Sequence, residues 1–79
     1  MVKILIVDDL PLLRRGAAEV LEERFPNVAL ARTGKIPEAR RFLDEEHWSL
    51  VLLDISLRES KGLDFLKEIG TSHPGTKVL

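Results

Sequence analysis

The sequence predicts an α/β domain of three layers, in which helices cover both faces of a parallel β-sheet. Two apolar runs, residues 3–7 and 50–53, contain no alternating polar positions and are typical of strands buried on both faces. Segments with helical spacing alternate with strands along the chain, which is the pattern of repeated βα units. Both apolar runs end abruptly in aspartate, at the end where open α/β sheets bind ligands.

The length and composition indicate one small domain. The chain has 79 residues, a formal net charge of −1 and no cysteine. The near-neutral charge implies no bulk attraction to nucleic acid or membranes, and the absence of cysteine excludes disulfides and thiolate metal sites. No apolar run approaches a membrane span, and the N-terminus does not resemble a signal peptide. We therefore expect a soluble, cytoplasmic protein without membrane contact.

The first half of the chain predicts a strand, a helix and a second strand. After the strand at residues 3–7, Pro11 suits the first position of a helix, where its missing N–H costs nothing. The apolar positions expected to face the sheet are Leu13, Ala17, Val20 and Leu21. Pro26 ends this helix, and residues 28–31 are expected to form the second strand.

The second half predicts two further helices and two strands. A helix is expected over residues 37–46, with Ile36 as a poor cap, and Trp48 is expected to be part of the core before the strand at residues 50–53. Gly62 begins a third helix, and residues 76–79 open a fourth strand. The residues expected to face inward from the third helix are Leu63, Leu66 and Ile69, with Phe65 beside them.

Three aspartates follow the two buried strands. Asp8 and Asp9 come after the first strand, and Asp54 comes after the third. Because parallel neighbours end at the same edge, the three carboxylates should converge, and they would repel one another without a cation or a proton. A simpler interpretation is that Asp8 and Asp9 only favour the start of the following helix. That interpretation does not explain Asp54, so we favour a metal site.

These residues resemble the receiver domain of two-component response regulators. The matching stretches are residues 4–9 and 50–57, followed by Gly62 and Leu63, and residues 8–16 are similar to the LuxR/FixJ-type subfamily. The resemblance implies a flavodoxin-like receiver fold with a parallel sheet in the order 2-1-3-4. It also implies that residues 1–79 are the N-terminal two-thirds of one receiver, a single incomplete domain lacking the C-terminal elements.

The resemblance implies a site and a function. Asp54 would be the phosphoacceptor for a sensor histidine kinase, so the protein would be a phosphorylated signalling module with a transcriptional output and not an enzyme. Asp9 and Asp54 would bind Mg²⁺ directly, Asp8 through a water, and the backbone carbonyl of Ser56 would complete the protein ligands. A phosphatase of the haloacid dehalogenase type is excluded, because that chemistry needs an acidic residue at position 56.

The sequence also departs from the family pattern. Receivers carry a Ser or Thr after the fourth strand and a Lys after the fifth, and the 79 residues end before both positions. Arg58 replaces the usual proline, and Lys61 replaces an acidic or small residue. The last two departures concern the loop conformation and not the metal ligands. We expect weak or unstable phosphorylation, because without the lysine part of the developing charge is left uncompensated. The alternative is a receiver-like module that acts only by self-association or protein binding.

Two further expectations concern partners. Self-association is expected through an exposed sheet edge or face. Direct nucleic-acid binding by these residues is not expected, because no recognition helix is present. The arginine pairs at positions 14–15 and 40–41 are interpreted as solvated helix faces, with a kinase contact by the first pair as the alternative.

Overall fold

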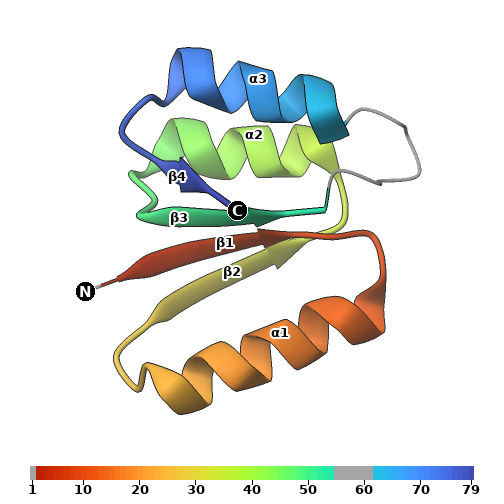
Figure 1. Cartoon of the computed structure of the whole chain (residues 1–79), viewed down its shortest axis with the longest axis vertical. Helices are drawn as coiled ribbons and strands as arrows, with labels where there is room; N and C mark the ends of the chain where they lie inside the picture. Colours follow the sequence, from red (N-terminus) through yellow and green to blue (C-terminus); the bar gives the residue numbers. More distant parts are fainter. Residues whose placement is uncertain (1, 55–61) are drawn as a thin grey trace.

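The strands and helices alternate throughout the part of the chain that the computed structural model describes, residues 2–54 and 62–79. The elements are β1 (Lys3–Val7), α1 (Pro11–Arg24), β2 (Ala29–Thr33), α2 (Ile36–Glu45), β3 (Leu50–Leu53), α3 (Gly62–Ser72) and β4 (Lys77–Val78). All strand pairs are parallel, and the sheet order is β2-β1-β3-β4 (Figure 1). The predicted order 2-1-3-4 is confirmed.

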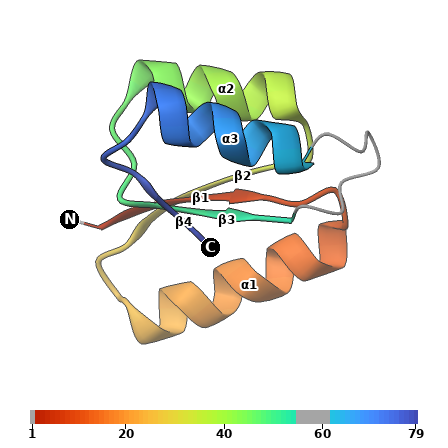
Figure 2. The ribbon, with the colours of Figure 1, turned by 45° about the horizontal axis from the view of Figure 1, so that its top comes forward.

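The helices form two layers around the sheet. Helix α1 covers one face, and α2 and α3 lie together over the other (Figure 2). Because successive side chains of a strand point to opposite faces, Ile4 and Ile6 of β1 pack with α1, whereas Leu5 and Val7 pack beneath α2 and α3. This confirms a central strand buried on both faces. No helix in the described ranges is long and apolar enough to cross a bilayer.

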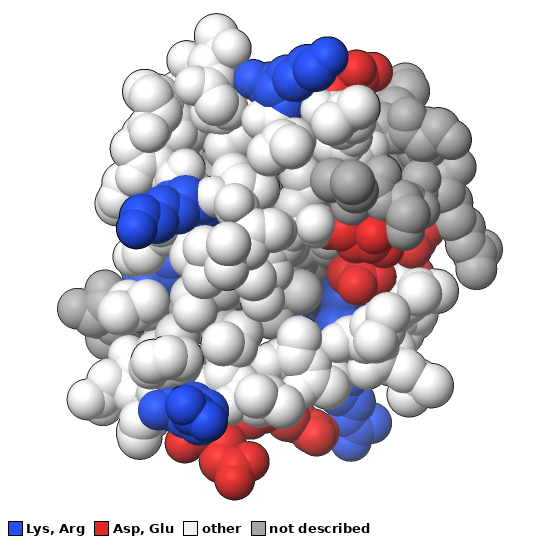
Figure 3. All heavy atoms as spheres, viewed as in Figure 1, with Lys and Arg blue, Asp and Glu red and all other residues white. Residues whose placement is uncertain are grey.

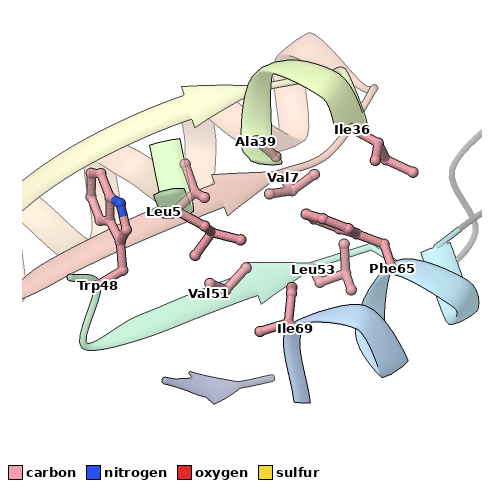
Figure 4. Close-up of a cluster of buried hydrophobic side chains, with 10 residues drawn as sticks. Leu5, Val7, Ile36, Ala39, Trp48, Val51, Leu53, Phe65 and Ile69 are labelled. Atoms are coloured by element: carbon pink, nitrogen blue, oxygen red, sulfur yellow. The ribbon is translucent and has the colours of Figure 1, made fainter. Parts of the chain in front are cut away.

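The larger part of the core lies between the sheet and the α2–α3 layer. Its members are Leu5, Val7, Ile36, Ala39, Leu43, Trp48, Val51, Leu53, Phe65 and Ile69 (Figure 4). Trp48 is only 3% exposed, and its indole Nε1 donates a hydrogen bond to the Phe42 carbonyl at 2.8 Å. The buried indole therefore has its donor satisfied and joins the end of α2 to the start of β3.

The bounds of three predicted elements are corrected by one or two residues. The fourth strand spans Lys77–Val78 and not residues 76–79. The second strand spans Ala29–Thr33 and not residues 28–31, and the second helix spans Ile36–Glu45 and not residues 37–46. Lys35 is the N-cap, and Ile36 is the buried first residue of α2. An apolar side chain at that position is explained by its core contact, so the interpretation of Ile36 as a poor cap was wrong.

The predicted inward faces of α1 and α3 are confirmed in part. In α1 Ala17 and Leu21 pack against the core as predicted and Ala18 is buried, whereas Leu13 and Val20 are 57% and 59% exposed.

In α3 Ile69 is buried and Leu66 packs against the core, as predicted, and Phe65 is buried as well, whereas Leu63 is 53% exposed. Both helices carry more apolar residues than one stripe can bury, and their orientation on the sheet decides which stripe is used.

Candidate metal centre

The strand register brings the predicted acidic residues to one edge. Val7 and Leu53 are paired in the sheet, so Asp8 and Asp54 leave it side by side. The backbone N–H of Asp54 donates to the Val7 carbonyl at 3.0 Å, and that of Asp8 donates to the Thr33 carbonyl at 3.0 Å. The backbone at the start of both loops is therefore held by the sheet ladder itself.

The three aspartates form one cluster, as predicted. Each of Asp8, Asp9 and Asp54 is half-buried, and one carboxylate oxygen from each lies within 4.8 Å of the others. Figure 3 shows acidic side chains gathered at this edge, beyond the ends of β1 and β3. Hard carboxylate oxygens at this spacing suit a small divalent cation such as Mg²⁺, which also offsets their mutual repulsion. The donor set therefore fits the cation that the sequence predicted.

Asp8 has a structural contact in addition to its place in the cluster. Its Oδ1 accepts a hydrogen bond from the Leu10 backbone N–H at 2.8 Å. This i to i+2 bond stabilises the turn before α1, whose N-cap, Leu10, makes no side-chain cap. Because a carboxylate has two oxygens, the turn leaves Asp8 able to act in the cluster as well. The role of Asp8 at the start of α1 and its role in a metal site are therefore compatible.

Arg14 contacts the site, which the sequence interpretation missed. Its Nη1 donates a hydrogen bond to the Asp8 carbonyl oxygen at 2.7 Å, and its side chain is half-buried. Arg15, by contrast, lies on the solvent face and pairs with Glu19 at 3.3 Å. The sequence contained a signal for this contact. Helical side chains point toward the helix N-terminus, and Arg14 is in the first turn of α1, close to Asp8.

A hollow adjoins the acidic cluster. It has a volume of about 420 Å³ and reaches both Asp8 and Asp54. Its remaining lining is apolar, from Ile6, Val7, Leu10, Leu13, Ala17, Leu52, Leu53 and Leu79. The carboxylates are thus approachable from one side. The proposed ligand Ser56 and the departures at Arg58 and Lys61 lie outside the described residues.

The fold and the cluster together define a class of protein. A parallel sheet in the order β2-β1-β3-β4 reverses its winding between β1 and β3, and ligands of doubly wound sheets bind at that point. The class is a flavodoxin-like α/β domain with an acidic centre at this position. The family model for the response regulator receiver domain matches residues 4–79, and the chain belongs to that family.

Curated relatives agree with the family. The chain is 38% identical to the transcriptional regulatory protein LnrK of Bacillus subtilis, with all of this chain and 36% of LnrK covered. It is 36% identical to the chemotaxis protein CheY of Listeria monocytogenes, with all of this chain and 66% of that protein covered. The chain thus spans about a third of LnrK and just under two-thirds of CheY.

Solved structures agree with the fold. The response regulator MaeR bound to beryllium trifluoride matches with a TM-score of 0.90 and 30% identity, over all of this chain and 65% of MaeR. TrrA of Thermotoga maritima, in complex with Mg²⁺ and a beryllium fluoride, matches with a TM-score of 0.87 and 29% identity. TrrA in complex with the histidine kinase ThkA matches with a TM-score of 0.86. Both TrrA matches cover 99% of this chain and 66% of the other.

Proposed function

We propose that this chain accepts a phosphoryl group from a histidine kinase onto Asp54, in the presence of Mg²⁺ held by the acidic cluster. The observation that carries the proposal is the convergence of carboxylate oxygens from Asp8, Asp9 and Asp54 within 4.8 Å at the β1–β3 edge. The complexes of TrrA with Mg²⁺ and with a kinase support the choice of ion and partner. LnrK, a transcriptional regulatory protein, supports a transcriptional output.

The roles proposed for the aspartates follow the resemblance to receiver domains. An Asp54 carboxylate oxygen attacks the phosphorus, the bond between phosphorus and the kinase imidazole breaks, and an acyl phosphate forms while the imidazole leaves with the bonding electrons. Asp9 and Asp54 would hold Mg²⁺ directly and Asp8 through a water, with the Ser56 carbonyl as a further ligand. The bound ion would neutralise charge on the phosphoryl oxygens.

The direct test is phosphorylation followed by intact-mass spectrometry. With acetyl phosphate and Mg²⁺, we expect a mass shift of one phosphoryl group on the wild-type chain, lost in Asp54→Ala and without Mg²⁺. Asp64→Ala removes an exposed acid from the first turn of α3 and serves as the matched control, which should be modified like wild type. Modification of Asp54→Ala at the wild-type level would overturn the assignment.

We also propose that the chain self-associates through the exposed surface of α1. The residues that favour this are Leu12, Leu13 and Val20, which are large, apolar and solvent-exposed. They border a shallow apolar groove of about 460 Å³, which Ala17, Leu21 and Leu52 also line. Figure 3 shows a broad surface free of Lys, Arg, Asp and Glu on the side of the molecule that carries the C-terminus.

A further inference from the structure

We propose that Arg14 is a positioning residue of the acidic centre, which holds the Asp8–Asp9 peptide so that both carboxylates meet Asp54. This inference rests on the proposed function, because it assigns a support to the same metal site. It begins from one contact, the 2.7 Å hydrogen bond from Arg14 Nη1 to the Asp8 carbonyl oxygen. A charged donor at this distance makes a stronger bond than a neutral one.

The hydrogen bond from Arg14 acts on both aspartates because its acceptor is the carbonyl of the peptide group that joins them. The Asp8 carbonyl belongs to the peptide group whose plane also contains the Cα atoms of Asp8 and Asp9. Holding that oxygen therefore restrains the peptide group from which both side chains project. The N–H of Asp8 is held by Thr33 and its Oδ1 by Leu10, so Arg14 supplies the third restraint on this residue.

Gly34 leaves open the space that the Arg14 guanidinium occupies beside the Asp8–Asp9 peptide. A Cβ added at Gly34 would overlap Arg14 Nη1, and it would lie 3.3 Å from the Asp8 carbonyl oxygen and 3.4 Å from the Asp9 Cα. The Asp8–Asp9 peptide thus lies against Gly34, in the loop between β2 and α2, with the Arg14 guanidinium beside it. A side chain at position 34 would compete for this space.

Arg14 has two effects of opposite sign on metal affinity, and the experiment must separate them. Its positive charge disfavours a nearby cation, whereas its hydrogen bond preorganises the ligands. Loss of an outer-shell partner costs about 10- to 100-fold in metal affinity. We infer that positioning dominates, so removing Arg14 weakens Mg²⁺ binding.

The test compares Mg²⁺ affinities of variants of the 79-residue chain by titration calorimetry, with urea unfolding in EDTA and in Mg²⁺ as a second measurement. Arg14→Met keeps most of the side-chain length but removes charge and donor, and we expect a loss of about tenfold in affinity. Arg14→Lys keeps the positive charge and a hydrogen-bond donor group, and its Mg²⁺ affinity should fall by less than about threefold. Arg15→Met, which removes the neighbouring charge on the solvent face, should bind Mg²⁺ like wild type. Equal or tighter binding by Arg14→Met would overturn the inference.

Gly34→Ala disturbs the hydrogen bond between Arg14 and the Asp8 carbonyl while leaving Arg14 in the sequence. We expect it to weaken Mg²⁺ binding in the wild-type background and to have a smaller effect in the Arg14→Met background, because both substitutions disturb one contact. Equal effects in the two backgrounds would overturn the inference. If Arg14→Met does not fold in EDTA, Gly34→Ala decides the question, and wild-type Mg²⁺ affinity in Gly34→Ala would overturn the inference.

Asp9→Asn separates this inference from the proposed function. If Asp9→Asn leaves Mg²⁺ affinity unchanged, the metal site itself is wrong and the role of Arg14 is refuted with it. If Asp9→Asn lowers the affinity and the Arg14 variants do not, the proposed function stands and only the inference on Arg14 is refuted.

Discussion

At the residue scale, Asp8 shows how one carboxylate serves a turn and a site together. Its Oδ1 accepts the Leu10 N–H, its backbone N–H is bonded to β2, and its carbonyl accepts Arg14. The same side chain stands within 4.8 Å of its partners in the acidic cluster. The hydrogen bond needs only an acceptor oxygen, whereas cation binding depends on the negative charge. The two roles can therefore be separated by substitution.

We predict that Asp8→Asn lowers Mg²⁺ affinity without lowering stability. The asparagine Oδ1 can still accept the Leu10 N–H, and one charge fewer relieves repulsion in the cluster, so the free energy of unfolding in EDTA should not fall below that of wild type. Mg²⁺ affinity should fall by about tenfold, since one ligand charge is lost. Asp8→Ala, which also removes the acceptor, should be less stable by about 1 kcal/mol. An unchanged Mg²⁺ affinity in Asp8→Asn would leave the turn as the sole role of this residue.

At the element scale, α2 and α3 are joined across their outer surfaces by an ion pair. Arg40 donates two hydrogen bonds to Glu68, from Nε at 2.7 Å and from Nη2 at 3.0 Å. The hydrogen bonds from Arg40 lower the pKa of Glu68, and the same bonds raise the pKa of Arg40. Their side chains are 47% and 37% exposed, so solvent screens the pair and its contribution to stability is small.

We predict that this pair stabilises the chain by at most about 1 kcal/mol at neutral pH, and that acid removes the effect. Glu68 has a lower pKa folded than unfolded, so its contribution is fully present above about pH 4.3, its unfolded value, and disappears as pH falls through the folded pKa. Urea unfolding of wild type and Glu68→Gln should therefore differ at pH 7 and converge as the pH falls through the lowered folded pKa of Glu68. Glu19→Gln, in the more exposed pair with Arg15, is the control and should have a smaller effect. A difference that grows on acidification would refute this account.

At the scale of the whole molecule, the two faces of the sheet are covered unequally. The α2–α3 layer encloses a continuous core, whereas α1 alone packs on the other face and buries only Ala18 completely. Apolar residues on α1 remain outside, and Leu12 is 85% exposed. Exposed apolar residues that adjoin one another in this way favour association with another surface.

We predict that the chain sediments as a dimer or larger species at roughly tens of micromolar, with the monomer fraction rising on dilution. Leu12→Glu or Val20→Glu should shift the equilibrium to monomer, because a charge would be buried at the contact. Leu63→Glu places the same charge at an exposed apolar site on α3 and should leave the association unchanged. A monomer at every concentration would contradict the proposed use of the α1 surface.

The sequence alone predicted two buried parallel strands that each end in aspartate, whereas the strand order 2-1-3-4, which makes them neighbours, was implied by the resemblance to receiver domains. Unbroken apolar runs identify β1 and β3 locally, and the parallel pairing of these two strands brings Asp8, Asp9 and Asp54 to one edge. Only the tertiary structure decided which stripe of α1 is buried and that Arg14 reaches the Asp8 carbonyl beside Gly34. Helical periodicity identifies candidate faces, but the packing of elements distant in sequence selects among them and sets which side chains meet.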